Sequence, residues 1–112
     1  MKIIKKSLTL NELKQMATMF GDMVKAVIDV DKGLMAIDGE LHSDLEALLL
    51  ENGSKQKNLW GINLYPESVG SEFIEFDSMI NMRPSQGNKS CGVNDKATAQ
   101  KIVEIVTKRI ER

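Results

Sequence analysis

The chain has 112 residues, of which 42% are hydrophobic and 28% are charged, a composition typical of a folded protein with one core. We therefore expect a single domain over residues 1–112. The net charge of −1 argues against nucleic acid or an anionic membrane as a partner, and no apolar run approaches the ~20 residues of a membrane span. The start MKIIKK lacks the apolar core of a signal peptide, and the single cysteine, Cys91, cannot form an internal disulfide, so we expect a cytoplasmic protein.

The first predicted element is a helix over about residues 10–20. Thr9 and Glu12 have the spacing of a capping box, in which each side chain satisfies a backbone N–H near the other. The apolar side chains that follow recur with a helical period, and Gly21 is a natural stop. Residues 2–5 ahead of this helix are a candidate for a short edge strand.

A β-hairpin is predicted next. In residues 23–30, MVKAVIDV, apolar side chains alternate with residues such as Lys25 and Asp29, which is the period-two pattern of a half-buried strand. Gly33 suits the left-handed position of a short bulged turn. Residues 34–37 then return as the second strand of the hairpin.

The middle of the chain predicts one helix and two further strands. Ser43 and Glu46 have the spacing of a second capping box, which predicts a helix over about residues 44–52. Residues 58–66 and residues 73–83 both alternate with a period of two, as strands do.

The last part of the chain predicts a loop and a helix. Residues 84–94 show no periodicity, which indicates a long loop. Asp95 or Asn94 is expected to cap the final helix. Its apolar stripe consists of Ala99, Ile102, Val103, Val106 and Ile110.

This order of elements predicts an α+β fold. Strands joined by short turns favour a mainly antiparallel sheet of about four strands, and we expect a two-layer sandwich with the helices on one face. That face should present Val24, Ile28, Trp60, Ile62, Phe76 and Ile80.

Polar side chains share the opposite face of the last predicted strand. They are Glu75, Asp77, Asn81 and Arg83, joined by Asn63 and Tyr65 if the two strands pair. Asp and Asn are depleted in strands, and neighbouring like charges are unfavourable, so this face is a candidate binding surface. The alternative is an ordinary solvated face of an antiparallel sheet, which needs no function.

The loop after this strand is a candidate anion site. Arg83 and Lys89 offer cationic donors, and Ser85 and Asn88 offer small hydrogen-bonding groups. Gly87 lets the backbone turn its N–H groups towards a phosphate or carboxylate. The predicted ligand site is therefore Asn63, Asp77, Asn81, Arg83, Ser85, Asn88 and Lys89. The alternative is a polar surface loop without a ligand.

Catalytic groups are harder to assign. His42 is the only histidine, and without a dense His or Cys cluster we expect no metal site. No nucleotide or hydrolase motif is present, and we expect no cofactor. If the protein is an enzyme, which the sequence leaves open, His42 or Asp77 would be the acid–base group and Arg83 the oxyanion clamp.

A second hypothesis is an interaction module without catalysis. Ile105 widens the apolar stripe of the last helix beyond what one-sided packing needs, so we expect a homodimer that uses this helix or the sheet face. The alternative is that Ile105 packs under the N-terminal segment of the same chain.

Three blocks of the sequence resemble a known family. FGDMVKAVIDVDKG, ALLLENGSKQKNLWGINLYP and EFDSMINMRPSQGNKS together resemble small archaeal and bacterial proteins classed as a domain of unknown function. The likeness extends from about Lys2 to Arg109. It implies a stand-alone cytoplasmic domain, and because the family has no established activity, it implies no catalytic residue.

Overall fold

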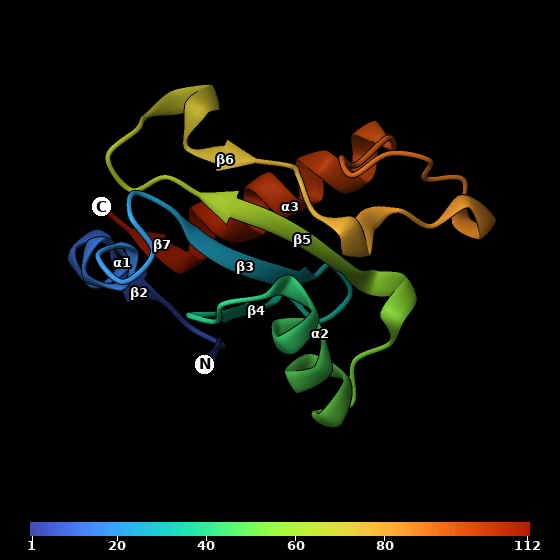
Figure 1. The fold of residues 1–112 in the computed structure, drawn as a ribbon, viewed down its shortest axis with the longest axis horizontal. Helices are drawn as coiled ribbons and strands as arrows, with labels where there is room; N and C mark the ends of the chain where they lie inside the picture. The colour runs from blue at the N-terminus through green and yellow to red at the C-terminus, as the bar shows by residue number, and fades with distance from the viewer.

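The computed structural model describes all residues, Met1–Arg112, and is built around one antiparallel sheet (Figure 1). The five strands lie in the order β1-β4-β3-β5-β6. Their bounds are β1 Lys2–Ile4, β3 Val24–Asp29, β4 Leu34–Ile37, β5 Leu59–Leu64 and β6 Ile74–Glu75. The helices are α1 Leu10–Ala17, α2 His42–Glu51 and α3 Lys96–Arg109. A separate parallel pair, β2 Leu8–Thr9 and β7 Ile110–Glu111, joins the N-terminal segment to the end of α3.

Local sequence signals explain where most elements begin. The Thr9 side chain accepts from the backbone N–H of Glu12 at 3.1 Å, and the Glu12 carboxylate accepts from Thr9 N–H, so the first capping box is confirmed. Gly33 takes a φ of 68° in the hairpin turn, as its left-handed position requires. Asp95 caps α3 by accepting from the backbone N–H of Thr98 at 2.9 Å.

The predicted start of α2 is wrong. The helix begins at His42, and the residue before it, Leu41, makes no side-chain cap. Ser43 therefore lies inside the first turn and does not cap it. The imidazole Nε2 of His42 lies 2.8 Å from the carbonyl oxygen of Ile62 on β5, and this contact holds the first turn against the sheet.

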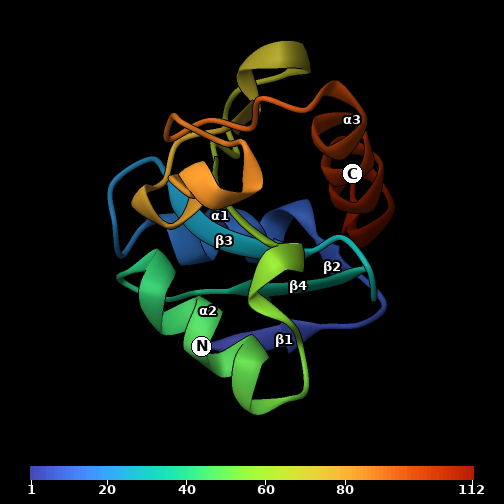
Figure 2. The same ribbon diagram turned by 90° about the vertical axis from the view of Figure 1, so that its right-hand side faces the viewer.

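The α+β class and the antiparallel sheet are confirmed, but the helices cover both faces of the sheet. α1 and α3 pack on the face that presents Val24, Ile28 and Ile62. On the other face, Leu45 and Leu49 of α2 pack against a smaller cluster of Val27, Ala36 and Leu59. Figure 2 shows α2 and α3 on opposite sides of the sheet. Apolar side chains on both faces of β3 and β5 create this second cluster.

The last predicted strand is mostly not a strand. Only Ile74–Glu75 pairs with β5, and a 3-10 turn, Met79–Asn81, follows. Ser78 caps this turn, since its hydroxyl accepts from the backbone N–H of Ile80 at 3.3 Å. The turn breaks the alternation, so Phe76 packs on the α1/α3 side while Ile80 packs on the α2 side.

The apolar stripe of α3 is used within the chain. Ile102 and Val106 are buried, and Ile105 is half-buried against the main core. The large exposed hydrophobic side chains all lie outside α3, and Val103 and Ile105 on this helix are half-buried. The homodimer itself stays a prediction. No helix combines the length and apolar character that crossing a membrane requires.

Gly61 on β5 should not tolerate a side chain. A Cβ atom at this position would lie 2.6 Å from both Cβ and Oγ of Ser78. We expect Gly61→Ala to lower the free energy of unfolding by about 1–3 kcal/mol, the usual cost of overpacking. Urea denaturation measures the change. Gly92→Ala is the control, because the nearest atom to its added Cβ is 3.4 Å away and its effect should be small. Equal stability of the two variants would contradict the prediction.

Candidate binding site

The predicted polar face forms only in part: Asn63, Tyr65 and Glu75 come together on the sheet, whereas Asn81 is in the core and Arg83 lies over Trp60. The strand register places Lys25, Asn63 and Glu75 in one cross-strand row. Asn63 Nδ2 donates to Glu75 Oε1 at 2.9 Å, and the Tyr65 hydroxyl donates to the same oxygen at 2.8 Å. These bonds from Asn63 and then Tyr65 lower the pKa of Glu75, and the bond to Glu75 raises the pKa of Tyr65 to about 12. Asn63 Nδ2, the Tyr65 hydroxyl and Glu75 Oε1 are thus engaged with one another, while Asn63 Oδ1 is buried without a partner.

His42 lies at the edge of this face, next to a small groove of about 190 Å³. Burial lowers its pKa, so the ring is neutral at pH 7. Because Nε2 faces the carbonyl oxygen of Ile62, the ring proton sits on Nε2. Asp77 is exposed, and its backbone carbonyl accepts from Asn63 Nδ2 at 3.3 Å. No group of three or more His, Cys, Asp or Glu side chains is placed to hold a metal ion.

Asn81 is fully buried and is bonded to the backbone of the protein. Its Oδ1 accepts from Gly61 N–H at 2.8 Å, and its Nδ2 donates to Gly61 C=O at 2.9 Å. The same Nδ2 also donates to the carbonyl of Cys91 at 2.8 Å. The side chain therefore takes the place of a neighbouring strand at this point of β5, and it presents no free group to a ligand.

Arg83 is turned inwards onto Trp60. Its guanidinium donates to the carbonyls of Gln56 and Leu59, the latter at 2.6 Å, and lies over the indole ring at 4.1 Å from its centre. Burial lowers the pKa of Arg83, and the charge of Glu46 opposes that change. The guanidinium is thus engaged in holding Trp60 and the segment before β5.

Asn88 organises the loop that follows Arg83. Its Nδ2 donates to the carbonyls of Asn81, Ser90 and Gly92 at 2.7, 3.1 and 2.8 Å, and its Oδ1 accepts from the N–H of Asn94 at 2.7 Å. The side chains of Ser85 and Lys89 are exposed and make no hydrogen bond within the protein. The predicted ligand residues are therefore spread over the sheet face, the core and the loop surface.

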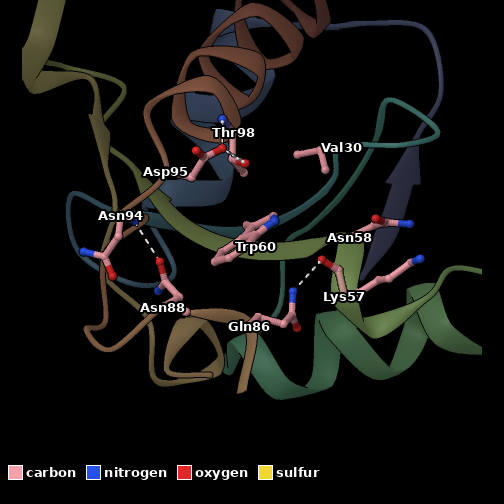
Figure 3. Close-up of a pocket in the computed structure, with 10 residues that line it drawn as sticks. Val30, Lys57, Asn58, Trp60, Gln86, Asn88, Asn94, Asp95 and Thr98 are labelled. Atoms are coloured by element: carbon pink, nitrogen blue, oxygen red, sulfur yellow. Dashed lines mark hydrogen bonds between the residues drawn. The ribbon is translucent and has the colours of Figure 1, made fainter. Parts of the chain in front are cut away.

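The largest concave region is a cleft of about 380 Å³, which we call the Trp60 cleft (Figure 3). Four segments meet at this cleft. They are the end of β3, the connection from α2 into β5, the loop 84–88 and the start of α3. In Figure 3 Trp60 lies in the middle of a ring of mostly polar side chains. The cleft is lined by Val30, Lys57, Asn58, Trp60, Gln86, Gly87, Asn88, Asn94, Asp95 and Thr98.

Trp60 gives this cleft its distinctive feature. The side chain is only 6% exposed, yet its indole N–H has no hydrogen-bond partner in the protein. The indole nitrogen is not sealed in the interior, and Figure 3 shows it on the side of the ring towards Val30 and Asn58, which line the cleft. An accessible donor of this kind can give its hydrogen bond to water or to a bound molecule.

Sequence reasoning missed most of this cleft. Of the predicted ligand residues only Asn88 lines it, and Trp60 was expected to be core, which is true of most of its surface. The one available signal was the polar pair Lys57–Asn58, directly before the buried strand β5.

Comparison with known proteins identifies the family. The family described as "Protein of unknown function (DUF5674)" matches residues 2–109, so the chain belongs to it, and the resemblance seen in the sequence is confirmed at that level. No curated protein and no solved structure matches the chain.

Removing the Asn81 side chain should destabilise the fold strongly. Asn81→Ala leaves the buried N–H and C=O of Gly61 without their partners, which should cost on the order of 3 kcal/mol in unfolding free energy. Chemical denaturation measures the loss. Asn11→Ala, at an exposed position of α1, is the matched control and should change stability little. A loss for Asn81→Ala no larger than for this control would refute its role as a strand substitute.

His42 should titrate below its ordinary pKa of 6.5 and make stability depend on pH. Burial is the largest cause and, with the charge of Lys25, lowers the pKa; together they outweigh the Ile62 carbonyl, Asn63 and Asp77, which raise it. Below about pH 6.5 the unfolded chain binds a proton that the folded protein does not, so stability should fall as the pH drops from 6.5 through the folded pKa.

The measurement is an NMR titration of the single histidine, combined with urea midpoints between pH 7 and 5. His42→Gln, which keeps a donor near Ile62, should abolish the slope in this range. Three carboxyl groups also have a lowered pKa: Glu12, Glu75 and Asp95. Their protonation lowers stability only below about pH 4.5, outside the range of this measurement. A histidine midpoint at or above 6.5 would contradict the prediction.

Proposed function

We propose that this member of the DUF5674 family binds a small polar molecule in the Trp60 cleft. The observation that carries the proposal is the unpartnered indole N–H of Trp60, which opens into a cleft of about 380 Å³. This volume lies within the ~300–1,000 Å³ range of small-molecule sites. The residues around the indole come from segments far apart in the chain, so a ligand would be held by the folded protein alone.

The proposal keeps the loop after Arg83 as part of the site but not the polar sheet face. Gln86, Gly87 and Asn88 form one wall of the cleft. On the sheet face, in contrast, Asn63, Tyr65 and Glu75 are already bonded to one another. The sheet face therefore supports the fold better than it supports a ligand.

The proposed role is binding, without a catalytic step. Among the side chains that line the cleft only Lys57 and Asp95 are charged, and Asp95 is committed to capping α3. The only hydroxyl among them, that of Thr98, donates to Asp95 Oδ2 at 2.6 Å, and this pair belongs to the N-terminal cap of α3. The setting that we propose is the reducing cytoplasm of a prokaryotic cell, in keeping with a single unpaired Cys91.

The chain offers a direct test, because Trp60 is its only tryptophan. We expect at least one compound in a panel of sugars, organic acids, amino acids and nucleosides to change the emission of Trp60 in a saturable way. The same compound should raise Tm. At 100 times its Kd it adds about 2.7 kcal/mol of stability, which corresponds to roughly 10 °C.

A blocking variant shows where the compound binds. Asn58 lines the cleft and its side chain makes no hydrogen bond in the protein, so Asn58→Arg should fill the cleft without unfolding the chain. It should abolish both responses, while Asn11→Arg on the surface of α1 should keep them. The proposal fails if no compound gives a response, or if the response survives in Asn58→Arg.

A further inference from the structure

The groups left free in the Trp60 cleft are a mixture of hydrogen-bond donors and acceptors. Trp60 offers a donor, and the Asn58 amide, which has no partner in the protein, offers both. Gln86 donates its Nε2 to the carbonyl of Lys57 at 3.2 Å, which leaves its Oε1 as an acceptor. Asp95 uses Oδ2 to hold Thr98, so its Oδ1 is a second free acceptor. A ligand must therefore both donate and accept.

The charges in the cleft argue against an anion. Lys57 and Asp95 are its only charged residues, and they are of opposite sign. Asp95 sits at the N-terminus of α3, where its carboxylate already neutralises the positive end of the helix dipole. Its bonds from Thr98 lower its pKa, so it is ionised at neutral pH and repels a phosphate or carboxylate. Arg83, the strongest anion-binding group nearby, is engaged with backbone carbonyls and Trp60.

The burial of Trp60 argues against a stacked aromatic or apolar ligand. The Arg83 guanidinium lies over the ring at 4.1 Å, and only 6% of the residue is exposed. The edge of the indole with its N–H, and not an open ring face, is therefore what the cleft presents. Val30 is the only other hydrophobic residue in the lining. Base–aromatic stacking needs an accessible face, which this cleft does not have.

Hydroxyl groups match this set of partners, because each one donates a hydrogen bond and accepts others. Resting on the binding function proposed above, we infer that the Trp60 cleft takes an uncharged, polyhydroxylated molecule of the size of one or two sugar rings. One hydroxyl oxygen accepts from the indole N–H of Trp60, and neighbouring hydroxyls donate to Asp95 Oδ1 and Gln86 Oε1. Asn58 contributes to either role.

The test uses the single indole N–H resonance of the ¹⁵N-labelled protein, which reports on Trp60 alone. Glucose, myo-inositol and maltose are the neutral probes. Sodium phosphate and glucose 6-phosphate test anions, and cytosine tests a planar base. We expect saturable movement of the indole resonance with at least one neutral probe, and weaker binding of glucose 6-phosphate than of glucose.

Two variants make the outcome specific. Asn58→Ala should weaken binding of the active neutral probe on the order of fivefold through the loss of its hydrogen bonds. Asn11→Ala should leave the affinity unchanged. The inference is overturned if only phosphate, glucose 6-phosphate or cytosine moves the resonance, in which case the cleft still binds a small molecule. It is also overturned if Asn58→Ala has no effect. If no compound of either panel acts at the cleft, the proposed function fails as well.

Discussion

The buried amide of Asn81 joins the second half of the chain to the sheet. It bonds to both the N–H and the C=O of Gly61, as a neighbouring strand would, and so satisfies the backbone of β5 where β6 has already ended. Gly61 makes this possible, because its missing Cβ leaves room for Ser78 on the same side. The His42 ring also approaches Gly61, so α2, β5 and the turn Met79–Asn81 meet at one glycine.

The walls of the Trp60 cleft depend on this junction. Asn88 donates to the carbonyl of Asn81, and through its other bonds it sets the course of the loop up to Asn94. Arg83 lies between Asn81 and Asn88 in the sequence, and backbone carbonyls hold its guanidinium over the Trp60 ring. Most polar side chains of this segment thus support the fold. They shape a cleft whose free hydrogen-bonding groups belong to neighbouring residues.

The two polar regions of the protein differ in what they leave unpaired. On the sheet face, Glu75 accepts from Asn63 and Tyr65, and Asn63 Oδ1, which has no partner, is sealed from solvent. In the Trp60 cleft, the indole N–H and the Asn58 amide remain without partners in the protein. Judged by composition alone, the sheet face would be the better candidate for a binding site than the Trp60 cleft, since it holds more charged residues. A binding site, however, depends on free hydrogen-bonding groups in a concave region, which is why we place the proposed site in the cleft.

The sequence by itself determined the local elements: the Thr9 cap of α1, the hairpin at Gly33, strand β5 and the Asp95 cap of α3. These depend on periodicity and on side chains within a few residues, so neighbours in the chain decide them. Tertiary structure alone decided that α2 covers the second face, because Leu45 and Leu49 can pack wherever an apolar partner such as Val27 lies. It also ended β6 early, because an amide 20 residues from Gly61 replaced a strand. The cleft is assembled from four separate segments, and no local sequence pattern shows which hydrogen-bonding groups remain unpaired once these segments pack together.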